Sequence, residues 1–236
     1  MTKLVYCKRC GSKNEVDAVF CRVCNEKLDT HEKITARSFL KLIRGLLFSP
    51  KKTFREIHSY EDFRIPIIIV IIGSALGGAN NFIFLDTLSA EMSKEIFITK
   101  GLTAMTSEAI LGSIIGLILW IIYDGAITHF FVRLFGGKRG IKTTLRMGGY
   151  AETPRLVFGL IFTVIFLILL FLGPSTFPIM LTLSEIMDKI YSSLGTWGLF
   201  LFAIGIREAH QLTNTKAFLI IAIPIGLLVV LAFLFL

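Results

Sequence analysis

The sequence has little charge for its length. Asp, Glu, Lys and Arg make up 18% of its 236 residues, whereas soluble domains average about 25%. Hydrophobic residues make up 54%, and the mean hydropathy is +0.72. These apolar residues gather in long blocks, and one core of this size cannot hide so much apolar surface from water. The composition excludes an ordinary soluble domain and favours a chain that lies largely in lipid.

The sequence also lacks the short motifs of common catalytic sites. It has no H-E-x-x-H among its four histidines, no G-x-S-x-G turn and no phosphate-binding P-loop. From the absence of these motifs, the sequence predicts that the chain is not an enzyme.

The N-terminal residues are polar and lead straight into a cysteine motif, so we expect no cleaved signal peptide.

Basic residues are unevenly distributed along the chain. Fourteen of the 25 Lys and Arg lie in residues 1–64, which indicates an anionic neighbour, either nucleic acid or lipid headgroups. The adjoining apolar blocks favour lipid. Residues 1–30 hold six basic and four acidic residues and no arginine stripe with interleaved aromatics, so nucleic acid is not the expected partner.

All four cysteines lie close together in the sequence, as the pairs Cys7-x-x-Cys10 and Cys21-x-x-Cys24. Two such pairs offer four thiolates to one ion, and Zn²⁺ favours a closed tetrahedral sulfur shell. The alternatives are two disulfides, which need an oxidising compartment, and a redox pair, which needs a larger scaffold. Residues 1–30 are predicted to form a zinc ribbon, stabilised by structural Zn²⁺ because so small a unit buries little apolar surface.

Residues 31–64 are predicted to form a basic connector of two amphipathic helices. In the first helix, Arg37, Lys41 and Arg44 share one face and apolar residues occupy another side. This pattern is typical of a helix that lies on a membrane surface. A helix packed on protein is the alternative.

The second connector helix is predicted to begin at Ser49-Pro50, because Ser is a good N-cap and Pro a good first helical residue. It carries the basic residues Lys51 and Lys52 and ends near Tyr60. We expect Phe54 and Ile57 to face the bilayer.

Five apolar blocks follow within residues 65–236 and are predicted to cross the membrane. The first is long enough to span about 30 Å of hydrocarbon. The fourth is shorter and weaker than the others. Pro224 should kink the fifth block without preventing a crossing. The predicted spans are residues 65–85, 109–132, 156–173, 191–206 and 217–236.

A helix stop separates the third and fourth blocks. It consists of Pro174-Ser-Thr-Phe-Pro178, and apolar residues then recur at helical spacing through residues 179–190, with polar residues between them. We expect this stretch to be a separate amphipathic helix on the outer surface of the membrane.

The distribution of Lys and Arg predicts the orientation, because cytoplasmic loops are enriched in these residues. Five spans with a cytoplasmic N-terminus place 22 of the 25 on the cytoplasmic side. The C-terminus then lies on the outer face of the cell membrane. If the fourth block does not span, the C-terminus becomes cytoplasmic with a similar charge bias.

Four polar side chains lie within or beside the predicted spans: Asp124, His129, Asn80 and Asn81. An unpaired charge in hydrocarbon is costly, so Asp124 should face the interior of the bundle, be protonated or meet a partner. Asn80 and Asp124 lie at different depths in antiparallel spans, and we do not expect them to touch. A structural polar clasp is favoured over a proton or ion relay. Small-x-x-x-small spacings at Gly73, Gly77 and at Gly112, Gly116 permit close helix packing.

Three stretches carry a resemblance to a known family: Leu46–Ile57, with LLFSPKKTFREI, Phe135–Pro154 and Trp197–Pro224. They resemble the Yip family of Ypt-interacting membrane proteins, and the first is similar to the pre-membrane segment of prokaryotic members. Phe135–Pro154 is similar to the loop after the second span of the family, and its characteristic residues are Gly136, Gly137, Tyr150 and Pro154. Trp197–Pro224 is similar to the last part of the family's membrane domain. The zinc ribbon is a separate attachment of a kind found on archaeal and bacterial membrane proteins.

The resemblance implies a cytoplasmic N-terminus, a five-helix membrane domain and a role in membrane organisation or trafficking. Eukaryotic relatives associate with small GTPases, and they often carry an Asp-Leu-Tyr-Gly-Pro-like segment before the first span. Tyr60–Pro66 of this chain lacks that segment.

The sequence thus predicts an all-α polytopic membrane protein with an N-terminal zinc ribbon. Its expected partners are the lipid bilayer and a cytoplasmic protein, and its oligomeric state is left open. The leading hypothesis is a non-enzymatic membrane scaffold or adaptor. The alternative is a small transporter or channel in which Asp124 is the coupling group.

Overall fold

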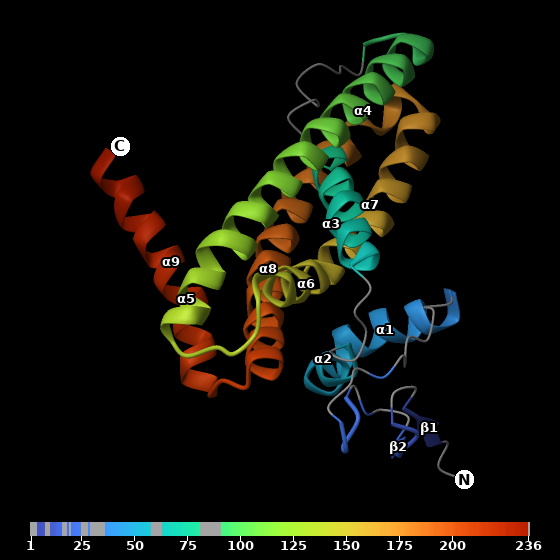
Figure 1. Cartoon of the computed structure of the whole chain (residues 1–236). Coiled ribbons are helices and arrows are strands. Elements are labelled where there is room, and N and C mark those ends of the chain that lie inside the picture. Colours follow the sequence, from blue (N-terminus) through green and yellow to red (C-terminus); the bar gives the residue numbers. More distant parts are fainter. Residues whose placement is uncertain are drawn as a thin grey trace. The chain divides into compact units, whose positions relative to one another are not determined.

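The computed structural model describes residues 4–7, 10–15, 18, 20–24, 28, 36–57, 63–80 and 91–235. The chain divides into two compact units, Met1–Asp62 and Phe63–Leu236. Figure 1 draws the first unit in shades of blue and the second from cyan to red.

The first unit contains a small hairpin and two helices. Strands β1 (Leu4–Tyr6) and β2 (Lys13–Glu15) pair antiparallel, with Val5 opposite Asn14. Helices α1 (Ala36–Phe48) and α2 (Pro50–Ile57) follow.

Helix α2 begins where the sequence predicts a helix start. Pro50 is its first residue, and the carbonyl of Ser49 accepts a bond of 3.1 Å from the backbone N–H of Thr53 and one of 3.0 Å from its hydroxyl. A side chain on Gly45 would overlap Thr53, so α1 and α2 meet closely at these two residues. Phe54 and Ile57 are buried. The expectation that these two residues face the bilayer is wrong. Other apolar side chains of the connector are exposed instead.

All regular secondary structure in the described residues of the second unit is helical. Its helices are α3 (Arg64–Ala79), α4 (Lys94–Leu119), the π-helical segment η2 (Trp120–Ile127), α5 (Thr128–Leu134), α6 (Ile141–Ala151), α7 (Thr153–Leu172), the short 3₁₀ turn η3 (Pro174–Thr176), α8 (Phe177–His210) and α9 (Asn214–Phe235).

Three helical stretches of the described residues are long and apolar enough to cross a membrane: Lys94–Leu134, Ile141–Leu172 and Pro174–His210. Arg64–Ala79 and Asn214–Leu227 are shorter apolar helices. The second predicted block, 109–132, is only part of the continuous run from α4 to α5. These long apolar helices support the membrane character of the chain, whereas its five-span count stays a prediction.

The expected surface helix at residues 179–190 is not separate from the fourth apolar block. Both belong to the single helix α8, which ends at His210, because no proline interrupts the helix after Pro178. The helix stops where Gln211 adopts a left-handed conformation, φ 56°, and its N–H bonds to the carbonyl of Arg207.

Small residues let α3 approach α4 closely. A Cβ on Gly112 would lie 2.6 Å from the carbonyl oxygen of Ser74 and 2.9 Å from the Cα of Gly78. The α4 pair Gly112 and Gly116 therefore packs as its spacing indicates, but it faces Ser74 and Gly78. The neighbouring residue Gly73 instead lies against Leu156 of α7.

An apolar core joins α4, α7 and α8 at the end of the bundle away from α6, as the ribbon in Figure 1 lets the reader follow. Phe97, Phe166 and Met180 are fully buried there. Phe97 meets Phe177 edge-on, with ring centroids 6.3 Å apart, an arrangement favourable for aromatic pairs. Helix α6 contributes no residue to this core.

Candidate metal centre and polar cluster around helix α6

The four cysteine sulfurs converge in the first unit. All four lie within 4.8 Å of one another, with 3.6 Å between Cys7 Sγ and Cys24 Sγ and 3.4 Å between Cys10 Sγ and Cys21 Sγ. A disulfide has a sulfur separation of about 2.05 Å, and the cysteines are free. Four thiolates around Zn²⁺, each about 2.3 Å from the metal, stand about 3.8 Å apart. The spacing fits a metal ion held between the two pairs.

Local backbone bonds shape the first cysteine pair. The N–H of Gly11 donates to the carbonyl of Cys7 over 2.8 Å, and the N–H of Cys7 donates to the carbonyl of Ser12 over 3.0 Å. Gly11 has φ +71°, a conformation that suits glycine. The tight turn returns the chain to β2 and leaves both sulfurs of the pair on one side.

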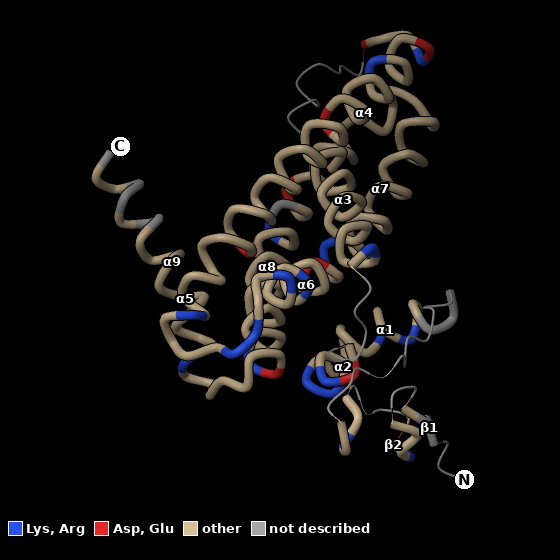
Figure 2. The backbone as a smooth tube through the Cα atoms, viewed as in Figure 1, with Lys and Arg blue, Asp and Glu red and all other residues tan. Residues whose placement is uncertain are grey.

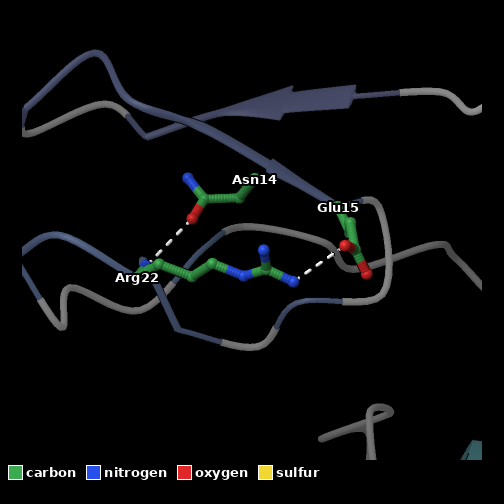
Figure 3. A network of polar contacts seen from close by, with 3 residues as sticks. All are labelled: Asn14, Glu15 and Arg22. Carbon is green, nitrogen blue, oxygen red and sulfur yellow. Dashed lines mark hydrogen bonds and ion pairs between the residues drawn. The ribbon is translucent and has the colours of Figure 1, made fainter.

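The sequence did not reveal that Asn14 holds the second pair against the first. Asn14 is buried; its side-chain N–H₂ donates to the carbonyl of Ser12 over 2.9 Å, and its Oδ1 accepts from the backbone N–H of Arg22 over 2.9 Å. Figure 3 shows this bond and the ion pair of 2.7 Å between Arg22 and Glu15. These bonds position the loop that carries Cys21 and Cys24.

The hydroxyl of Ser12 lies within hydrogen-bond distance of two of the four cysteine sulfurs. It lies 2.9 Å from Cys21 Sγ and 3.1 Å from Cys10 Sγ. The hydrogen bond with Ser12 lowers the pKa of Cys21 to about 5, helped by backbone N–H groups at Cys24 and Val23. The same hydroxyl lowers the pKa of Cys10. A thiolate is the form that binds metal, so the Ser12 hydroxyl favours the metal-binding form of Cys10 and Cys21.

Helix α6 is the most polar buried element of the second unit. Thr144, Arg146 and Tyr150 on it are buried, together with both glycines of its Gly148-Gly149 pair. A Cβ on Gly149 would overlap Pro66 of α3, and the indole N–H of Trp120 in η2 donates to the carbonyl of Leu145 over 3.0 Å. The helix therefore lies between other helices instead of forming an exposed loop.

A chain of hydrogen bonds links two histidines through α6. The hydroxyl of Thr144 lies 2.8 Å from His129 Nδ1 and 3.1 Å from His210 Nε2. His210 Nδ1 accepts from the backbone N–H of Arg139 over 3.3 Å. The sequence singled out His129 but gave no signal for Thr144 or His210, which come from α6 and the end of α8.

Gly136 and Gly137, two of the four characteristic residues of the stretch Phe135–Pro154, lie in a turn whose backbone is held by several neighbours. Gly136 has φ +87°. Gly137 is buried and has no room for a side chain beside Val132 and His210. The Lys216 ammonium donates to the carbonyl of Phe135 over 3.1 Å.

The other two motif residues are buried, Tyr150 in α6 and Pro154 at the start of α7. Lys138 and Lys142, which flank the turn, are exposed. Figure 2 shows the basic segments that gather around this end of the second unit. The motif therefore builds a fixed turn with basic side chains on its outer side.

Asp124 and Asn80 lie in different surroundings, and the structure gives them no shared partner. Asp124 belongs to η2, and its carboxylate packs against Gly148. The ion pair of Glu152 and Arg155, 2.8 Å apart, lies within electrostatic reach.

Asn80 is buried at the end of α3. Its side-chain N–H₂ lies 3.1 Å from the carbonyl of Gly159, 3.0 Å from the hydroxyl of Thr163 and 3.0 Å from that of Tyr191. These contacts join α3, α7 and α8. Asn81 lies outside the described residues.

The basic connector residues lie on α1 and α2. Lys41, Arg44, Lys51 and Lys52 are exposed, and Arg37 lies in the first turn of α1. The four exposed side chains, those of Lys41, Arg44, Lys51 and Lys52, are available to an anionic surface.

Comparison with known protein families gives one match. The profile of the Yip1 domain matches residues 44–236, which includes α2 and the whole second unit; residues 1–43 and the cysteine cluster lie outside the match. No curated protein and no solved structure matches the chain.

Proposed function

Because the Yip1 domain model matches residues 44–236 and this chain therefore belongs to the Yip1 domain family, we propose that it is a non-enzymatic membrane adaptor of prokaryotic or archaeal type. The second unit anchors it in the cell membrane through five helices. The cysteine ribbon and the turn before α6 each present a cytoplasmic surface on which a protein can dock. The proposal extends to membrane organisation or trafficking-like processes, with a GTPase as one class of partner.

The observation that carries this proposal is the way the turn at Phe135–Gly140 is built. His210, Lys216 and the buried Gly137 fix its backbone, while Lys138 and Lys142 remain exposed. A fixed backbone loses little conformational entropy on binding, and exposed cations steer acidic partners. The described geometry suits recognition of an acidic protein surface.

The ribbon is proposed to hold a structural Zn²⁺. Four sulfur donors form a closed set in the described residues, and four thiolates leave no coordination position for a substrate. Metal analysis of the purified protein should give one zinc per chain, and Cys21→Ala should abolish it. A full zinc complement in that variant would refute the assignment.

A pull-down tests the adaptor function. The wild-type protein in detergent is compared with a variant lacking residues 1–30 and with Lys138→Glu/Lys142→Glu. Both changes should remove specific partners. The matched control is Lys94→Glu/Lys100→Glu, two exposed cations at the start of α4, which the orientation places outside and which should retain them. An unchanged partner set in both test variants would contradict the proposal.

A transporter or channel is the second candidate, favoured by the π-helical segment around Asp124. Such segments are rare and often mark functional sites, and this one places the carboxylate beside α6 and near the Glu152–Arg155 pair. The candidate predicts ion or proton flux in proteoliposomes that Asp124→Asn abolishes. Equal flux in both proteins would count against it.

A further inference from the structure

The exposed side of α1 combines apolar and basic side chains. Leu40 and Phe48 are 66% and 79% exposed, and Lys41 and Arg44 are exposed beside them. Leu40, Arg44 and Phe48 follow one another at four-residue spacing, so they form one row along the helix. Leu42, on the other side of α1, is buried.

Two more exposed cations follow shortly after this row in the chain. Phe48 ends α1, and Lys51 and Lys52 lie in the first turn of α2, where both are exposed. The apolar side of α2 is buried through Phe54 and Ile57. The free apolar surface of the connector is therefore at Leu40 and Phe48, beside the cations, and not on α2.

The charge of this segment is mostly of one sign. Helices α1 and α2, residues 36–57, contain six Lys and Arg and a single acidic residue, Glu56, near the end of α2, and Figure 2 shows the basic stretches on both helices. Anionic headgroups attract each such cation near a membrane surface. Large apolar side chains among cations are the composition of helices that lie in the interface of a bilayer.

The length of the chain keeps this segment close to the membrane. Helix α2 ends at Ile57 and α3 begins at Arg64. The seven peptide steps from Ile57 to Arg64 can reach at most about 25 Å. If α3 enters the bilayer, α2 cannot leave its surface by more than this distance, so the local concentration of headgroups around the segment is high.

We infer that the face formed by Leu40, Lys41, Arg44, Phe48, Lys51 and Lys52 docks on the anionic headgroup surface of the bilayer that holds the second unit. Phe48 and Leu40 enter the interface, and the four cations lie among the phosphates. This inference rests on the membrane placement in the proposed function. It adds a lipid-specific contact that would hold the ribbon's connector against the surface.

The test uses the full-length protein in nanodiscs of phosphatidylcholine with and without phosphatidylglycerol. Phe48 is replaced by the photocrosslinker p-benzoylphenylalanine, and lipid adducts are measured by mass spectrometry. The control places the same group at Val23, which is 73% exposed in the ribbon. Adducts should form at position 48, increase with phosphatidylglycerol and exceed those at position 23.

Charge substitutions separate docking from mere proximity. In the crosslinking protein, Lys51→Glu/Lys52→Glu should lower the lipid adducts at least about fivefold, the factor expected for one lost cation near an anionic surface. Lys51→Arg/Lys52→Arg should retain them. Absence of lipid adducts, adducts with protein alone, or a yield indifferent to charge reversal would overturn the inference. Co-elution with nanodiscs tests the membrane placement separately, so a negative result at position 48 speaks against this face alone.

Discussion

The hydroxyl of Thr144 on α6 joins this helix to α5 and α8. It is fully buried and lies within hydrogen-bond distance of His129 Nδ1 and His210 Nε2. Thr144→Val keeps the shape but leaves two imidazole nitrogens without this partner. Each buried polar group left unpaired costs about 1–3 kcal/mol. We expect the free energy of unfolding to fall by about 2 kcal/mol, measured by denaturation in mixed micelles.

Two substitutions control for this result. Thr144→Ser keeps the hydroxyl and should recover most of the lost stability. Thr106→Val removes an exposed hydroxyl that bonds only within its own helix, to the carbonyl of Leu102 over 2.7 Å, and should change stability by less than about 0.5 kcal/mol. A Thr144→Val protein as stable as the Thr106→Val protein would show that the bridge contributes nothing.

At the same scale, the sequence predicts local sites better than distant ones. The cysteine cluster could be predicted because each pair is set by two intervening residues and by the chemistry of sulfur. The partners Ser12 and Asn14 are close in sequence, yet they look like ordinary turn residues. Thr144 and His210 are 66 residues apart, and only the packing of α6 against α8 brings them together.

Gly112 tests the packing of one element on another. A Cβ there would lie 2.6 Å from the carbonyl oxygen of Ser74, and helix backbones cannot move apart without losing other contacts. Gly112→Ala should therefore lower the free energy of unfolding by about 1–3 kcal/mol. Gly195→Ala is the matched control, because no atom lies within 4 Å of its Cβ position.

The control should have the opposite sign. Alanine is favoured over glycine inside a helix by up to about 1 kcal/mol, so Gly195→Ala should be neutral or slightly stabilising. Equal effects of both substitutions on the unfolding midpoint would show that α3 and α4 are not in close contact. The sequence indicated small-residue packing but not which residues meet, because Gly73 and Ser74 are neighbours that point toward different helices.

Element boundaries were predicted least well where the chain leaves the hydrocarbon. Hydropathy located the apolar blocks, but α4 begins at Lys94, well before the block that starts at 109, and α8 extends through residues that looked like a separate surface helix. Backbone hydrogen bonding continues a helix through polar residues when no proline or turn stops it. A hydropathy pattern reports the solvent around a helix and not its length.

At the scale of the whole molecule, the number of helices that cross the membrane determines on which sides the two chain ends lie. Helix α8 has 34 residues, about 51 Å at 1.5 Å per residue, and exceeds the roughly 30 Å of a bilayer core. Helix α9, with 22 residues, reaches about 33 Å and can cross. Helix α3 has 16 residues, about 24 Å, and is the shortest candidate. If all five apolar helices cross, the two chain ends lie on opposite sides.

Epitope tags at residue 1 and after residue 236 distinguish the arrangements in sealed vesicles of known orientation. With cytoplasmic sides outward, protease should remove the N-terminal tag and spare the C-terminal one. Detergent should expose both, which controls for a tag that is hidden by folding. Removal of both tags from intact vesicles would mean an even number of crossings. One of the two shorter apolar helices, α3 or α9, would then not cross the membrane. If α9 is the helix that does not cross, the Lys and Arg bias is unchanged because residues 217–236 contain neither residue, so charge alone could not reveal that arrangement.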